Sequence, residues 1–311
     1  MLPRIQAVVC AVDRSAFSER VVGYGAALAR RAGARLILLH AVHDPQDGAH
    51  PTTVFERGGD LTHLADDARR YMVQLLAGAG AGADGEVVVR HGEAVEQTLA
   101  LVDALPPCLV VSASHGMSGF RRLMIGTVVE RLSRALDQPM LVVKPSPNGD
   151  MDGRHGFQRM VVGCDGAGHW RRSASLLALL QGDAAAHIHF VQAMEGPRAP
   201  HDDVDASLTY AQAQAALQAQ SNRRLLVQAQ TLPLGAAVVS AAAAPGVPDE
   251  MVLRAARAQA ADLLVVGVRR SGRLERWISG STTEALLRRA PCSVLTLPEP
   301  RSPAGAAGGP S

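Results

Sequence analysis

The chain has 311 residues, of which 47% are hydrophobic and 19% charged, and its formal net charge is only +2. This balance excludes an intrinsically disordered chain, and a nearly neutral protein offers no general attraction for nucleic acid. No segment has the roughly 18 consecutive apolar residues of a membrane helix, and the first apolar run is too short for a signal peptide. We therefore expect a cytoplasmic protein with no nucleic acid or membrane partner.

Short apolar runs alternate with helical patterns along the first half. Residues 5–12 predict a buried strand, and the following segment predicts a helix from Ser15 to Arg31 that Gly33 ends. Proline and glycine recur between His43 and Gly59, which predicts a loop. The other predicted elements are strands at 35–42, 86–90, 108–113 and 140–144, and helices at 60–78, 93–105 and 127–137.

The second half repeats this order. The predicted strands lie at 159–165, 187–194, 236–240, 262–268 and 293–297, and the helices near 170–180, 205–230, 248–259 and 282–289. Strands that are apolar along their length and alternate with helices predict parallel sheets covered on both faces. We therefore expect an α/β protein with two tandem open-sheet domains, each a five-stranded parallel sheet with helices on both faces.

The domain boundaries follow from composition. Residues 1–146 and 157–298 form the two predicted domains, and a polar, glycine-rich linker separates them. The tail at 299–311 holds little besides small residues, proline and polar residues, so it is predicted to be disordered. Because each half has enough residues to bury its own core, we interpret the repeat as a duplicated domain and not as a solenoid.

The halves are most alike where a strand-like run passes through a glycine-spaced loop into a helix. This segment spans 109–132 in the first half and 263–287 in the second. Both loops end in glycine and a hydroxyl residue, at Gly126-Thr127 and Gly280-Ser281. Glycine lets backbone N–H groups approach an anion, and a helix N-terminus carries unpaired N–H groups. A phosphate site is therefore predicted, the alternative being glycines that serve turn geometry alone.

In each half, an aspartate ends the first strand. Asp13 and Asp165 fall at the carboxyl edge, where open parallel sheets gather ligands. Such a carboxylate can accept hydrogen bonds from a base or sugar, or it can cap the helix that begins shortly afterwards. Both interpretations stay open for Asp13, and capping is favoured for Asp165.

Other chemistry finds little support. The eleven histidines are scattered without ligand spacing, so no metal site is expected, and only His115 lies inside a glycine loop. The string Gly80-x-Gly82-x-x-Gly85 precedes a strand, the wrong context for a dinucleotide fingerprint. No P-loop, GxSxG or HExxH motif is present, so no catalytic residue is assigned. The four cysteines show no CxxC spacing and are expected to be buried thiols.

These motifs resemble those of the universal stress protein family in its tandem two-domain form. The resemblance rests on the strand-ending aspartates, on loops of the Gly-x-x-Gly-(nine residues)-Gly-Ser/Thr kind, and on final strands such as the one that follows Pro139. It covers residues 5–297. It implies a Rossmann-like fold related to adenine nucleotide alpha hydrolases, edge-to-edge pairing of the two domains as a pseudo-dimer, and ATP binding with or without Mg²⁺.

The resemblance also places the site residues. Asp13 and Ala41 would border adenine and ribose, and the phosphates would lie against the loop. The implied phosphate-site residues of the first half are Ala113, His115, Gly116, Gly126 and Thr127. Their counterparts in the second half, with the aspartate, are Asp165, Gly267, Arg270, Gly280 and Ser281.

Each loop departs once from the family pattern. Ala113 replaces the first glycine of the first loop, a small intrusion, whereas Arg270 replaces the second glycine of the second loop. If that position needs positive φ, arginine strains it by about 1 kcal/mol or more; if not, the guanidinium can clamp a phosphate. We therefore predict that the first half is the better ATP site.

The predicted function is an ATP-binding stress-response regulator with slow hydrolysis or none. One alternative is an interaction module of the same fold that binds no nucleotide, since neither loop is complete. A second is an ATP-pyrophosphatase-like enzyme, which needs a Ser-Gly-Gly-rich loop after the first strand, and residues 12–18 do not supply one. The predicted partners are an adenine nucleotide, the other domain of the same chain and, in one alternative, a second copy.

Overall fold

The computed structural model describes residues 4–42, 61–80, 85–114, 126–145, 156–165, 169–182, 185–194, 204–268 and 280–298. The predicted loop at 43–59, the predicted tail at 299–311 and the predicted linker, apart from Gly156, lie outside the described residues.

The predicted alternation of strands and helices is confirmed in both halves. The first half contains β1 (Ala7–Ala11), α1 (Ser18–Ala32), β2 (Arg35–Val42), α2 (Leu61–Gly78), β3 (Gly85–His91), α3 (Ala94–Asp103), β4 (Cys108–Ala113), α4 (Thr127–Ala135) and β5 (Met140–Val143). The second contains β6 (Arg159–Cys164), the 3₁₀ helix η3 (His169–Ser173), α5 (Ala174–Gln181), β7 (His187–Met194), α6 (Val204–Gln230), β8 (Val238–Pro245), α7 (Pro248–Ala258), β9 (Leu263–Val268), α8 (Gly280–Arg289) and β10 (Ser293–Pro298).

The strands form one sheet in the order β3-β2-β1-β4-β5-β10-β9-β6-β7-β8. Neighbouring strands within each half are parallel, as predicted. The halves meet at the antiparallel pair β5–β10, in which Leu141 lies opposite Leu295. These two leucines are separated by the same 154 positions as Gly126 and Gly280. The central pairing therefore has the register that two identical strands would adopt about a two-fold axis.

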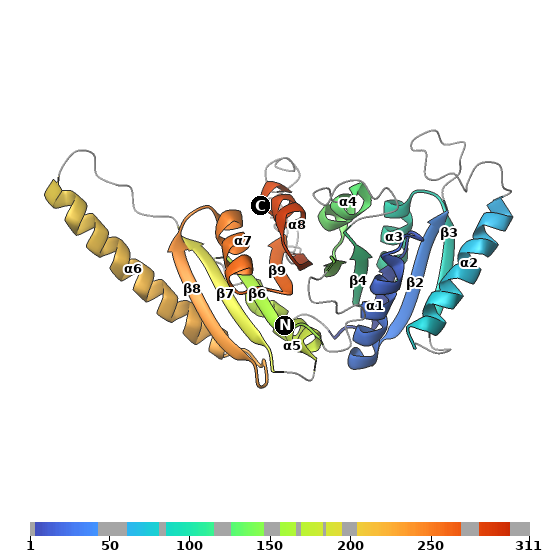
Figure 1. Ribbon diagram of the computed structural model, residues 1–311, viewed down its shortest axis with the longest axis horizontal. Helices are drawn as coiled ribbons and strands as arrows, with labels where there is room; N and C mark the ends of the chain where they lie inside the picture. Colours follow the sequence, from blue (N-terminus) through green and yellow to red (C-terminus); the bar gives the residue numbers. More distant parts are fainter. Residues whose placement is uncertain are drawn as a thin grey trace, which may run out of the picture.

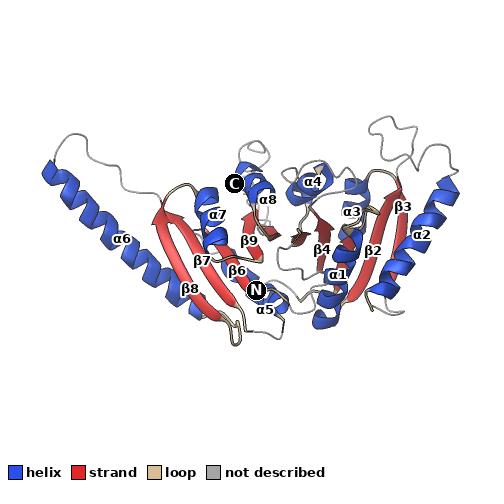
Figure 2. Ribbon diagram, in the orientation of Figure 1, coloured by secondary structure: helices blue, strands red, loops and turns tan. Residues whose placement is uncertain are grey.

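Helices cover both faces of this sheet (Figures 1 and 2). One face packs against α1, α2, α5 and α6, and the other against α3, α4, α7 and α8. Successive side chains of a strand point to opposite faces of the sheet, so each strand contributes to both cores. In β1, Val8 and Cys10 face the first set of helices, whereas Ala7 and Val9 face the second. Each hydrophobic core therefore runs continuously across the two halves.

Three elements differ from prediction by three residues or more at one end. Helix α1 begins at Ser18 and not at Ser15, because residues 13–17 form a turn held by side-chain hydrogen bonds. Strand β8 begins two residues later than predicted and continues through an alanine run to Pro245, since it pairs with β7 along its length. The segment around Trp170 is a 3₁₀ turn that precedes α5.

Candidate functional site

The predicted site residues of the first half that the structure describes lie at the carboxyl ends of three adjacent strands. Ala11 of β1 pairs with Leu39 of β2 on one side and with Ser112 of β4 on the other. Asp13, which follows β1, and Ala41, near the end of β2, therefore lie at the same edge as Ala113, which ends β4. The strand order reverses between β1 and β4, and open α/β sheets bind ligands at such a point.

Two backbone hydrogen bonds bring the ends of the glycine loop together. The Ser114 N–H donates to the Val143 carbonyl at 3.0 Å, and the Gly126 N–H donates to the Ser114 carbonyl at 3.1 Å. The start of α4 is thereby held directly at the end of β4. The loop itself, with the predicted residues His115 and Gly116, lies outside the described residues.

The N-cap residue of α4 supplies no side-chain cap. Its N-cap is Gly126, which makes no side-chain cap hydrogen bond, and Thr127 is the first residue of the helix. Helix α3 differs, because its N-cap Glu93 accepts hydrogen bonds from the N–H groups of Val95 and Glu96. First-turn amides that no side chain caps are suited to an anionic ligand.

Neither packing nor backbone geometry requires glycine at Gly126. Its φ is −61° and its ψ is 139°, which other residues adopt, and an added Cβ would lie 3.9 Å from its nearest neighbour, the Ser114 carbonyl oxygen. Gly267 of β9 is exposed, and no heavy atom of the described residues lies within 4 Å of an added Cβ. The space that the described residues leave beside both glycines is compatible with close approach of a phosphate to the backbone.

The second half repeats the arrangement. Asp165 directly follows β6, Gly267 lies on β9, and Gly280 and Ser281 are the first two residues of α8. Strands β6 and β9 are neighbours, so Asp165 and the carboxyl end of β9 again lie side by side at the reversal of strand order. Arg270 lies outside the described residues.

Asp13 forms a local turn before α1 and does not cap this helix, whose N-cap is Phe17, so the capping role is wrong for this residue. Its Oδ1 accepts the Ser15 N–H at 3.1 Å, and the Ser15 hydroxyl accepts the Phe17 N–H at 3.2 Å. Between them Arg14 has a φ of 63°, the left-handed region, and its guanidinium carbon lies 5.8 Å from the centre of the Tyr71 ring. Sequence analysis did not single out Arg14. The available signal was Gly166, which follows the aspartate of the second half, because glycine favours positive φ.

His40 was also missed. It is buried on β2, and its Nδ1 lies 2.7 Å from the carbonyl oxygen of Val12, to which it donates. This bond holds the residue that precedes Asp13 against β2. The available signal was a single polar residue in the apolar run 36–42.

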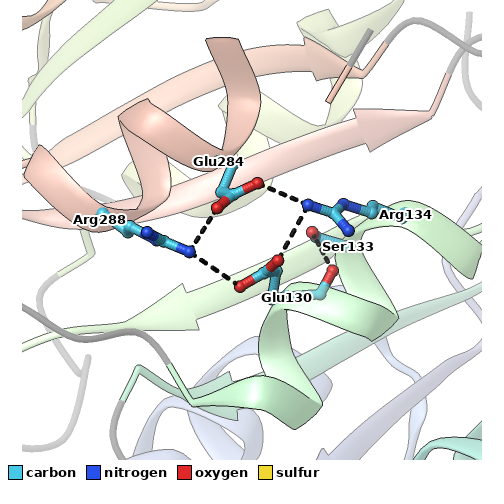
Figure 3. Close-up of polar contacts among 5 residues, drawn as sticks. All are labelled: Glu130, Ser133, Arg134, Glu284 and Arg288. Atoms are coloured by element: carbon cyan, nitrogen blue, oxygen red, sulfur yellow. Dashed lines mark hydrogen bonds and ion pairs between the residues drawn. The ribbon is translucent and has the colours of Figure 1, made fainter. Parts of the chain in front are cut away.

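An ion-pair ring joins α4 of the first half to α8 of the second (Figure 3). Arg134 Nη2 lies 2.9 Å from Glu130 Oε1 and 2.5 Å from Glu284 Oε2. Arg288 Nη2 lies 3.2 Å from Glu130 Oε2 and also pairs with Glu284. The two carboxylates are 21% and 24% exposed, whereas the guanidinium side chains are about half exposed. We call these four residues the α4–α8 ring.

A buried lysine also crosses between the halves. Lys144, which follows β5, donates from Nζ to the Ala290 carbonyl beyond α8 at 2.8 Å, and its own carbonyl accepts from Arg20 at 3.1 Å. Burial lowers the pKa of Lys144 to about 8, and a smaller effect of Cys292 opposes this shift.

An aromatic contact joins the halves on the other face of the sheet. Tyr24 stacks on Phe157 with ring centres 5.4 Å apart.

The cysteines are free thiols, as predicted. Cys10, Cys108 and Cys292 are buried, and Cys164 is partly buried. Burial raises the pKa of each of the three buried thiols to about 12, so they are poor nucleophiles. Within the described ranges, no three histidine, cysteine or acidic side chains are placed to hold a metal ion. No helix in the same ranges is long and apolar enough to cross a membrane.

These features define a tandem α/β protein with a candidate anion site at the sheet-to-helix junction of each half. The model of the universal stress protein family matches residues 4–144 and 156–298. The chain therefore belongs to the universal stress protein family, which confirms the resemblance seen in the motifs.

Solved structures with the same fold cover nearly the whole chain. A universal stress protein from Archaeoglobus fulgidus is 17% identical with a TM-score of 0.61, and the match covers 95% of this chain and 97% of that one. A protein of unknown function from Pseudomonas aeruginosa is 14% identical with a TM-score of 0.64, covering 94% and 92%. The comparison with curated proteins found no match.

Proposed function

We propose that this chain is a cytoplasmic stress-response regulator that binds ATP at the junction of β4 and α4 and hydrolyses it slowly or not at all. Binding would change the conformation of the glycine loop or the affinity of the protein for a partner. The second junction, between β9 and α8, is the weaker site in this proposal, because Arg270 replaces a loop glycine.

The observation that carries the proposal is the helix start at Gly126. Its N-cap residue supplies no side-chain cap, and among the described residues the nearest neighbour of an added Cβ is 3.9 Å away. Asp13 and Ala41 lie at the same sheet edge, where they would border the nucleoside. Because the described residues hold no acidic cluster suited to a metal, Mg²⁺ would enter with the triphosphate and not by a site of its own.

Calorimetric titration with ATP tests the proposal. The parent protein should bind, Gly126→Val should remove most of the binding, and Gly280→Val should remove little. Valine tolerates the observed φ of −61° and ψ of 139°, so the first variant should fold. Phosphate release measured on the same samples should be slow or absent. No heat from the parent protein would contradict the proposal.

The main alternative is an interaction module that binds no nucleotide. Ala113 and Arg270 favour it, since each stands where the family pattern has glycine. Gentle purification followed by native mass spectrometry separates the two, because co-purified nucleotide would exclude the alternative. An ATP-pyrophosphatase-like enzyme has less support, because Asp13, Arg14 and Ser15 form a turn with no glycine where that chemistry needs a glycine-rich loop.

We also propose that the two halves act as a pseudo-dimer within one chain. The antiparallel β5–β10 pair, the α4–α8 ring and the hydrogen bond from Lys144 to Ala290 support this assignment. Light scattering of the purified protein should give the mass of one chain, and the mass of two would indicate a dimer of such chains.

A further inference from the structure

Glu130 lies in the first turn of α4, four residues after Gly126 and therefore about 6 Å along the helix axis. A carboxylate at this position stabilises the helix through its dipole. It also repels a second anion at the same N-terminus. The candidate phosphate site of the first half thus carries an unfavourable charge in its own helix.

Two arginines neutralise this carboxylate, and one of them comes from the other half (Figure 3). Arg134 of α4 contacts Glu130 at 2.9 Å, but the same Nη2 atom also contacts Glu284 at 2.5 Å. Arg288 of α8 contacts the second Glu130 oxygen at 3.2 Å. Because Arg134 is shared, Glu130 is fully compensated only when Arg288 is in place.

We propose that Arg288 of the second half sets the anion affinity of the first half's site by neutralising Glu130. The inference rests on the proposed function, in which the start of α4 binds phosphate. Arg288 acts through Glu130 and is therefore a positioning residue. It makes the first site dependent on the pairing of the halves, since without α8 the phosphate would meet an undercompensated carboxylate.

The repeat indicates that the arrangement is reciprocal. Glu284 and Arg288 lie 154 positions after Glu130 and Arg134, so each glutamate receives one arginine from its own helix and one from the opposite helix. Both carboxylates are more enclosed than the arginines that flank them. The ring is thus a self-complementary contact that supplies each candidate site with charge from the other half.

The expected effect is modest and depends on salt. One uncompensated charge about 10 Å from a triphosphate should weaken binding about two- to fivefold at 0.1 M ionic strength, where the Debye length is also about 10 Å. At about 1 M salt the Debye length falls to about 3 Å, and the difference should nearly vanish.

The experiment is an ATP titration of the full chain, parent and four variants. Arg288→Gln should lose affinity by the stated factor, and Glu130→Gln should gain affinity. In the double variant Glu130→Gln/Arg288→Gln, the arginine substitution should have no further effect, because the charge it compensates is gone. The matched control is Arg289→Gln on the same helix, whose arginine is equally exposed and contacts Asp249 at 3.5 Å.

The outcomes separate this inference from the proposed function. If the parent protein binds ATP but Arg288→Gln and Arg289→Gln behave alike, or if Arg288→Gln weakens binding equally in both Glu130 backgrounds, the inference is wrong and the proposed function stands. If the parent does not bind ATP, both are wrong. Thermal unfolding of each variant identifies any loss of fold. Removing an exposed ion pair rarely causes such a loss.

Discussion

The replacement Gly25→Ala in α1 tests the packing that places the first site. An added Cβ at Gly25 would lie 2.1 Å from the Cys10 Sγ atom of β1 and 3.3 Å from Cδ1 of Leu36. Real Cβ atoms do not approach sulfur this closely, and Cys10 is fully buried. Either the Cys10 side chain must leave its position or helix α1 and strand β1 must move apart locally to admit the methyl group.

The expected loss follows from two opposing effects. Over-packing a well-filled core costs about 1–3 kcal/mol, and this contact is short enough to place the cost near the upper end. Replacing glycine by alanine inside a helix returns about 1 kcal/mol. Gly25→Ala should therefore lower the free energy of unfolding by about 2 kcal/mol.

Urea unfolding followed by circular dichroism measures this free energy in the parent, Gly25→Ala, Cys10→Ala and the double variant. Without the sulfur atom the added methyl group has space, so in the Cys10→Ala background Gly25→Ala should be neutral or stabilising by up to about 1 kcal/mol. The same loss in both backgrounds, or no loss in the parent, would refute this account of the α1–β1 contact.

Three further variants test other parts of the structure. In Lys144→Met, the pH profile should lose the contribution of the lysine: the folded pKa of about 8 lies below the unfolded 10.5, so Lys144 adds about 2 kcal/mol of stability between pH 7 and 9.5 as the folded state releases the proton first. Arg14→Gly relieves a positive φ and should stabilise the protein by about 1 kcal/mol in thermal unfolding. Glu93→Ala removes the α3 cap and should cost about 1 kcal/mol in urea unfolding.

Each of these has its own control. The buried thiols of Cys10 and Cys108 affect stability equally in the parent and in Lys144→Met. Lys144 lowers the pKa of Cys292, so both proteins are compared in a Cys292→Ala background to isolate the lysine. An unchanged pH profile in that variant would contradict the assigned burial. Arg14→Ala keeps the strain and should not stabilise. Arg131→Gln removes the partner of Glu93 but keeps the cap, so it should cost much less than Glu93→Ala.

Much of the site could be predicted because its signals are local. The apolar run 108–113, the glycine at 126 and the helix pattern after it indicate a strand-to-helix junction from neighbouring residues alone. The comparison of the halves then showed that the junction recurs. The turn after β1 was missed in detail, because side-chain hydrogen bonds of Asp13 and Ser15 delay the helix that the apolar pattern placed three residues earlier.

By itself the amino-acid sequence determined the order of strands and helices, the parallel sheets, the duplication and the family, since these depend on local periodicity and turn residues. The tertiary structure alone decided that β5 pairs with β10, that Glu130 meets Arg288 and that Lys144 reaches Ala290. Contacts between residues some 150 positions apart depend on how helices pack on a twisted sheet, and the sequence pattern within either segment does not predict which residues of the other segment it will contact.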